Sequence, residues 1–98
     1  MEFKHENPTA RFVVPDRPTV RQQLEYYSMA AGATESEFIV RLWRAAQALI
    51  TEWECEKLPL FKADLDSVSD PSQTTVIIWA AMAVRNFMNG LEDLPKNS

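Results

Sequence analysis

The feature that most constrains this chain is an apolar run in its C-terminal third. Residues 71–84 carry no charged side chain, and within them Val76–Val84 (VIIWAAMAV) is apolar without interruption. At helical pitch such a run covers the whole circumference of a helix, so no side of it favours contact with water. The helix is therefore either the centre of a small bundle or partly covered by another protein. We expect Ile78 to be buried, and the substitution Ile78→Asp to unfold the domain.

Composition limits the classes of protein to which the chain can belong. A chain of 98 residues makes one domain with one core. Its net charge of −4 offers no general attraction to nucleic acid or to anionic lipid. Cys55 is the single cysteine, which excludes an internal disulfide and fits a reducing compartment. The N-terminus lacks the apolar segment of a signal peptide, and the longest apolar run is too short to cross a bilayer. We expect a soluble, intracellular protein.

Three residues mark the starts of helices. Each has a side chain that can accept a hydrogen bond from a backbone N–H of the first helical turn. These caps are Thr19, Thr34 and Asp70. With the apolar stripes that follow them, they predict helices near residues 19–31, 35–55 and 71–90. The first helix is expected to bury a stripe made of Val20, Leu24, Tyr27 and Ala31.

The N-terminal residues are rich in proline, which interrupts helical hydrogen bonding. They predict an extended arm over residues 1–18, with a short strand at Arg11–Val14 for which the sequence shows no evident partner. The predicted fold is therefore all-α, a small bundle of three main helices behind a proline-rich arm. In this organisation residues 19–91 form the helical domain and residues 92–98 a flexible C-terminal tail.

No pattern of residues predicts catalysis or metal binding. His5 is the only histidine, and it lies far in sequence from Cys55, so a nucleophilic pair has no evident third group to orient it. The acidic stretch Asp64–Asp70 begins like a calcium loop, but Ser69 and Thr75 stand where that loop needs Gly and Glu. We therefore expect no enzyme activity, no catalytic residues, no cofactor and no metal.

A DNA-binding protein is an alternative, because two helices joined near Gly32 have the outline of a helix-turn-helix. The residues that would enter the groove first include Glu35 and Glu37, whose carboxylates would repel the phosphates. A DNA-binding regulator is therefore a third and less favoured interpretation.

Large apolar side chains exceed what a three-helix core needs to bury. The chain has three tryptophans and four methionines, residue types that are enriched at protein interfaces. We therefore expect the second and third helices to present an apolar groove to a protein partner, with arginines beside it that steer acidic segments. The predicted lining is Trp43, Trp79, Met82 and Met88, and the predicted flanking cations are Arg41, Arg44 and Arg85.

Three stretches together carry a resemblance to a known family. They are FVVPDRPTVRQQLEYYS, LWRAAQALITEWECEKLP and DPSQTTVIIWAAMAVRNFMNGLEDLPKN, within roughly residues 10–97. They resemble the small tail assembly chaperones of long-tailed bacteriophages and related prophages. The resemblance implies a helical, non-catalytic protein in the host-cell cytoplasm that takes no small-molecule substrate. It also implies that the chain binds the tape measure protein, keeps its apolar helices soluble and helps to recruit tail tube subunits.

A second class of function stays open beside the chaperone. The chain would then be a structural component of the tail, such as a completion or connector subunit, with its apolar surface permanently buried in a ring. Association of identical copies into a homo-oligomer would likewise cover the apolar surface. A mass-spectrometric inventory of the finished virion separates a component, which stays, from a chaperone, which leaves.

Overall fold

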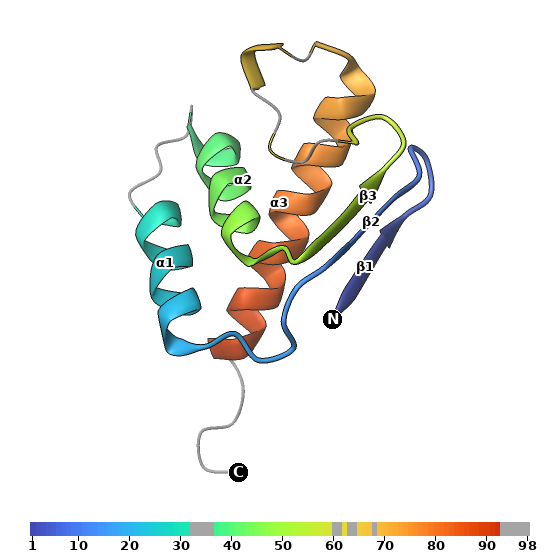
Figure 1. The fold of residues 1–98 in the computed structure, drawn as a ribbon. Helices are drawn as coiled ribbons and strands as arrows, with labels where there is room; N and C mark the ends of the chain where they lie inside the picture. Colours follow the sequence, from blue (N-terminus) through green and yellow to red (C-terminus); the bar gives the residue numbers. More distant parts are fainter. Residues whose placement is uncertain (32–36, 60–61, 63–64, 68, 93–98) are drawn as a thin grey trace.

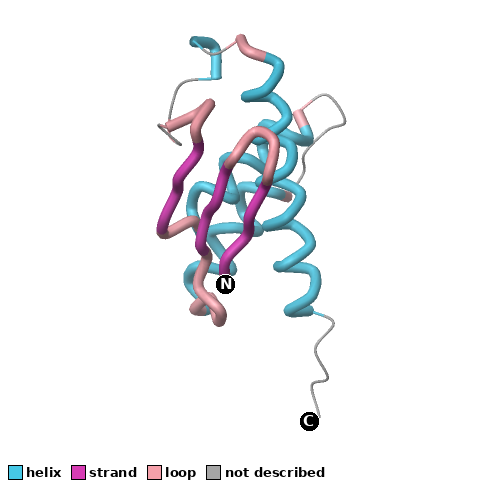
Figure 2. Tube along the Cα trace, turned by 90° about the vertical axis from the view of Figure 1, so that its right-hand side faces the viewer, coloured by secondary structure: helices cyan, strands magenta, loops and turns pink. Residues whose placement is uncertain are grey.

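The computed structural model describes residues 1–31, 37–59, 62, 65–67 and 69–92, which form a sheet packed against helices (Figure 1). The strands are β1 (Glu2–His5), β2 (Ala10–Val13) and β3 (Glu52–Cys55), and the helices are α1 (Val20–Ala30), α2 (Phe38–Leu49) and α3 (Pro71–Glu92), with a short 3-10 helix at Leu65–Ser67. The three strands are antiparallel in the order β1-β2-β3. Figure 2 shows the strands together in front of the helices, with β1 at the side where α3 runs.

The predicted all-α fold is therefore wrong, because the described residues include a three-stranded sheet. The predicted N-terminal arm is the β1–β2 hairpin, and its residues Phe12 and Val14 are fully buried. The predicted short strand near Arg11–Val14 does exist, with a partner strand on each side. Phe12 lies opposite Phe3 of β1 and opposite Trp53 of β3.

The third strand replaces the predicted end of the second helix. Helix α2 stops at Leu49, and the next residue, Ile50, has extended backbone angles. The Thr51 N–H then donates to the Val13 carbonyl at 2.8 Å, which begins the pairing with β2. Along β3 Glu52 and Glu54 are exposed while Cys55 is buried, an alternation that suits a strand covered on one face.

Two of the three predicted helix caps are confirmed. Thr19 and Gln22 form a complete capping box at the start of α1. The Asp70 carboxylate accepts the Ser72 N–H at 2.9 Å at the start of α3, and Pro71 is the first helical residue. The predicted cap at Thr34 lies outside the described residues.

The buried side of helix α1 differs from the predicted one. Most of its expected buried stripe is exposed, because Val20 is 70% and Leu24 is 64% exposed and Ala31 is exposed as well. Tyr27, the remaining member of the stripe, is half-buried and packs against the core. The buried residue of α1 is Tyr26, and burial raises the pKa of its phenol. The helix packs mainly on α2, so only one side of it is covered.

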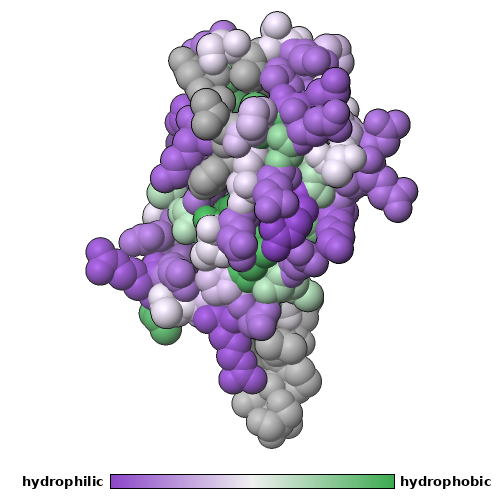
Figure 3. All heavy atoms as spheres, turned by 45° about the vertical axis from the view of Figure 1, so that its right-hand side comes forward, coloured by the Kyte–Doolittle hydropathy of each residue, from purple (hydrophilic) through white to green (hydrophobic). Residues whose placement is uncertain are grey.

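The core lies between the inner face of the sheet and the helices α2 and α3. A series of neighbouring aromatic rings crosses it: Trp43 to Trp53 at 5.5 Å, Trp53 to Phe12 at 6.0 Å, and Phe12 to Trp79 at 5.1 Å between ring centroids. The face of the molecule drawn in Figure 3 is mostly hydrophilic, with apolar atoms in small patches. None of the described helices combines the length and the apolar content that a bilayer span requires.

A candidate protein-binding groove

An apolar groove lies between β1 and α3, and we call it the α3 groove. Its volume is about 740 Å³. It is lined by Met1 and Phe3 from the β1 side and by Ile78, Trp79, Met82, Ala83, Asn86, Phe87, Gly90 and Leu91 from α3. Among these described lining residues Asn86 has the one polar side chain. The groove is therefore suited to an apolar occupant.

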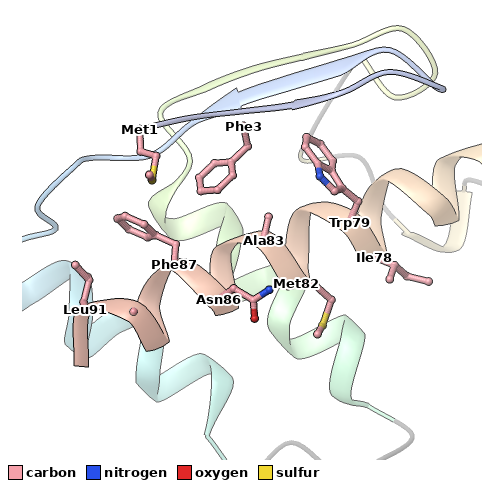
Figure 4. Close-up of a pocket in the computed structure, with 10 residues that line it drawn as sticks. Met1, Phe3, Ile78, Trp79, Met82, Ala83, Asn86, Phe87 and Leu91 are labelled. Atoms are coloured by element: carbon pink, nitrogen blue, oxygen red, sulfur yellow. The ribbon is translucent and has the colours of Figure 1, made fainter. Parts of the chain in front are cut away.

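Helical spacing explains why α3 forms one wall of the groove. Trp79, Ala83 and Phe87 follow one another at four-residue intervals and therefore lie on one side of the helix. The two aromatic rings contact the strand: Phe87 lies 6.3 Å from Phe3, and Trp79 lies 5.1 Å from His5, between ring centroids. The small Ala83 between them leaves the space that the groove occupies (Figure 4).

Two neighbouring side chains of α3, Ile78 and Met82, border the side of the groove that is open to solvent. Ile78 is 42% exposed, and Met82, one turn further on, is half-buried. Figure 4 shows both side chains pointing away from the sheet. The expectation that Ile78 is buried is therefore wrong, because the sheet and α2 cover other sides of α3.

The predicted lining residues divide into two groups. Trp79 and Met82 line the α3 groove. Trp43 is 1% exposed and Met88 is 0% exposed, so both lie in the core and neither is available to a partner. The sheet accounts for the burial of Trp43, because Trp53 of β3 packs on it.

The predicted steering arginines do not line the groove. Arg41 donates to the Ala31 carbonyl at 2.9 Å, and Arg44 lies exposed on α2. The Arg85 guanidinium lies 5.3 Å from the ring centroid of Phe38 at the start of α2. None of the described side chains that line the groove carries a charge.

Several lining residues were missed by the sequence analysis. Met1 and Phe3 were assigned to an extended arm, and no role was predicted for Phe87 or Leu91. A signal for Phe3 was present in the alternation of apolar and polar residues in the stretch Met1–Lys4, which is typical of a strand with one covered face.

His5 and Cys55 lie on the two strands that flank β2. The strand registers place both residues beside Ala10, on opposite sides of β2, so their backbones are about 10 Å apart across two strand spacings. His5 Nδ1 is within hydrogen-bond distance, 2.7 Å, of the Pro8 carbonyl oxygen, and Cys55 is buried. Among the described residues no three His, Cys, Asp or Glu side chains lie close enough together to hold a metal ion.

Comparison with known proteins gives no match to this chain among family models, curated proteins or solved structures. The α3 groove is thus the feature from which a function can be inferred.

Proposed function

We propose that the chain is a tail assembly chaperone that binds an apolar helical segment of the tape measure protein in the α3 groove. The observation that carries this proposal is the groove itself, an open hollow with an almost entirely apolar lining. Grooves of this kind take up amphipathic helices through anchor side chains that recur every three or four residues.

The side chains of the groove suit a client of variable sequence. Met82 is flexible and polarisable, so it adapts to different partner side chains. Ile78 offers branched apolar surface at the open side, and Phe3 and Phe87 form a fixed aromatic floor. The net charge of −4 keeps a protein with such a surface soluble. In this proposal strand β1 forms one wall of the groove. The resemblance to a family of helical proteins did not imply a strand at the site.

Co-expression with the tape measure protein of the same phage or prophage tests the proposal. The variant Met82→Asp places an unpaired carboxylate in the groove, where it should weaken client binding by about 2 kcal/mol or more, roughly 30-fold in Kd. The matched control is Leu24→Asp, which changes an exposed apolar residue on α1 outside the groove. We expect the client to stay soluble with the wild type and the control, and to precipitate with Met82→Asp.

Two results would contradict the proposal. One is a client that stays insoluble with the wild-type chain. The other is equal client solubility with Met82→Asp and Leu24→Asp while both variants keep the circular dichroism spectrum of the wild type.

A second candidate is a structural subunit of the tail, which a separate observation favours. Val20 and Leu24 form a further exposed apolar surface on α1 that is not part of the α3 groove. A subunit of a closed ring needs two different contact surfaces, one for each neighbour. Its presence in purified virions at a fixed copy number would support this candidate, whereas its absence would support the chaperone.

A further inference from the structure

Strand β1 has an open edge, because among the described residues no strand pairs with its outer side. The Val14 N–H donates to the Met1 carbonyl at 3.0 Å, so these two residues form a hydrogen-bonded pair. Hydrogen-bonded pairs alternate along an antiparallel ladder, so Phe3 and His5 also direct their backbone groups to β2. The backbone N–H and C=O groups of Glu2 and Lys4 therefore point to the open edge.

The side chains of this edge carry opposite charges. Glu2 and Lys4 lie on the outer face of the sheet, where their side chains are 42% and 71% exposed. Phe3 lies between them in sequence and faces α3. Arg11 donates a hydrogen bond to Glu2, which lowers the pKa of that carboxyl, so Glu2 is ionised near neutral pH. The edge thus presents a negative and a positive side chain on either side of an apolar one.

We propose that a second copy of this chain binds at this edge, with the two β1 strands antiparallel and the two-fold axis at Phe3. In this register Glu2 of each copy lies opposite Lys4 of the other. Both residues direct their backbone groups outward, so each such pair exchanges two main-chain hydrogen bonds. The charge on one strand is complementary to the charge on the other, which stabilises cross-strand neighbours.

Other registers are disfavoured by the same features. Moving one copy by two residues places Glu2 opposite Glu2, or Lys4 opposite Lys4, and like charges directly opposite are destabilising. Moving it by one residue places the outward backbone groups of Glu2 opposite Phe3 of the other copy. The backbone N–H and C=O of Phe3 already bond to β2. The register with Phe3 at the axis combines opposite charges with available hydrogen-bonding groups.

The pairing joins two three-stranded sheets into one of six strands. It places Phe3 beside Phe3 of the second copy and brings the two α3 grooves to the same side of the joined sheet. Met1, which is 53% exposed, and Ile78, which is 42% exposed, border this region in each copy. Strands of four residues give a short ladder, so we expect a dimer that dissociates on dilution.

Charge exchange tests the register. The variant Lys4→Glu gives β1 two acidic residues, and the variant Glu2→Lys gives it two basic residues. Each variant alone should self-associate at least about tenfold more weakly than the wild type, because both cross-strand pairs become repulsive. An equal mixture of the two should form a one-to-one heterodimer, since every cross-strand pair is then attractive. Sedimentation equilibrium over a dilution series measures the three association constants.

Amide hydrogen exchange supplies a second measurement. Exchange at Glu2 and Lys4 should slow as the protein concentration rises, because dimerisation pairs their N–H groups. Thermal unfolding of both variants checks that the fold is kept. This matters because both substitutions remove the ion pair between Glu2 and Lys4, and Glu2→Lys also removes the one between Glu2 and Arg11. A wild type that is monomeric throughout, a dimer insensitive to both substitutions, or a mixture that fails to associate would overturn the proposal.

The dimer does not depend on the proposed function. It forms without a client, and Lys4→Glu leaves the groove-lining side chains unchanged. Client solubility with Lys4→Glu therefore reports on the groove, and sedimentation of the free chain reports on the edge.

Discussion

Val76 and Ile78 stand two positions apart in the longest apolar run, yet they face different surroundings. Two residues correspond to about 200° around a helix, so the two side chains point to nearly opposite sides. Val76 is 0% exposed, whereas Ile78 is 42% exposed. By residue type the two positions are equivalent. Their exposure differs because the sheet and α2 cover only some sides of α3.

This contrast gives a prediction for a matched pair of variants. Val76→Asp buries an unpaired charge and should cost more than about 3 kcal/mol, a large part of the stability of a small domain. Ile78→Asp keeps its carboxylate in water and should stay folded. Urea unfolding followed by circular dichroism measures both free energies of unfolding. Equal destabilisation by the two substitutions would mean that Ile78 is covered in solution.

Two of the ten residues that line the α3 groove were predicted from the sequence. Trp79 and Met82 were predicted because large apolar side chains in an uncharged helix exceed the needs of a small core. Trp43 has the same residue type, but it lies beneath β3, a strand that the sequence analysis treated as helix. Phe3 was missed because its role depends on α3, which follows much later in the chain.

At the scale of elements, the starts of α1 and α3 and the strand β2 were predictable, whereas β1 and β3 were not. A cap is a local signal: Thr19 with Gln22, or Asp70 with Ser72, satisfies backbone groups within one turn. A strand depends on partners that are distant in sequence. The alternation in Glu52–Cys55 indicated a strand, but a preceding apolar stripe at helical spacing favoured extending the helix.

The cap of α3 gives a pH-dependent prediction. The Ser72 backbone N–H holds the pKa of Asp70 below its ordinary value. The carboxylate therefore contributes fully to stability above the unfolded-state pKa. This contribution is lost as pH falls through the folded-state pKa. Asp70→Ala should therefore lower the Tm near neutral pH, and the difference from wild type should shrink below about pH 4.

Thermal melts of both proteins across the acid range measure this difference. Asp70→Asn retains an acceptor for the Ser72 N–H and serves as the control that does not titrate. A Tm difference between Asp70→Ala and wild type that stays constant as pH falls would show that ionisation of Asp70 does not stabilise the helix.

At the scale of the whole molecule, Phe12 joins the sheet to α3. It is 0% exposed in the central strand, and its ring lies near those of Trp53 and Trp79. Phe12→Ala should destabilise the fold by about 3–5 kcal/mol, because it leaves a cavity between the two layers. Urea unfolding followed by tryptophan fluorescence measures this loss.

The control for Phe12 is Met29→Ala on α1, where the side chain is 41% exposed and the change should stay within about 0.5 kcal/mol. A loss at Phe12 no larger than that at Met29 would show that the two layers do not depend on this contact.

The position of β2 between its partners has a consequence for the order in which the molecule assembles. The β1–β2 hairpin is contiguous in sequence and can close within about 1–10 μs once residues 1–14 are free to move. The other ladder pairs Arg11 with Glu54, and both α1 and α2 lie between these residues in the chain. We therefore expect that, during synthesis on a ribosome, the β3-facing edge of β2 stays unpaired until both helices have emerged. Docking of α2 then brings β3 next to this edge, since Thr51, two residues beyond the end of α2, donates a backbone hydrogen bond to β2.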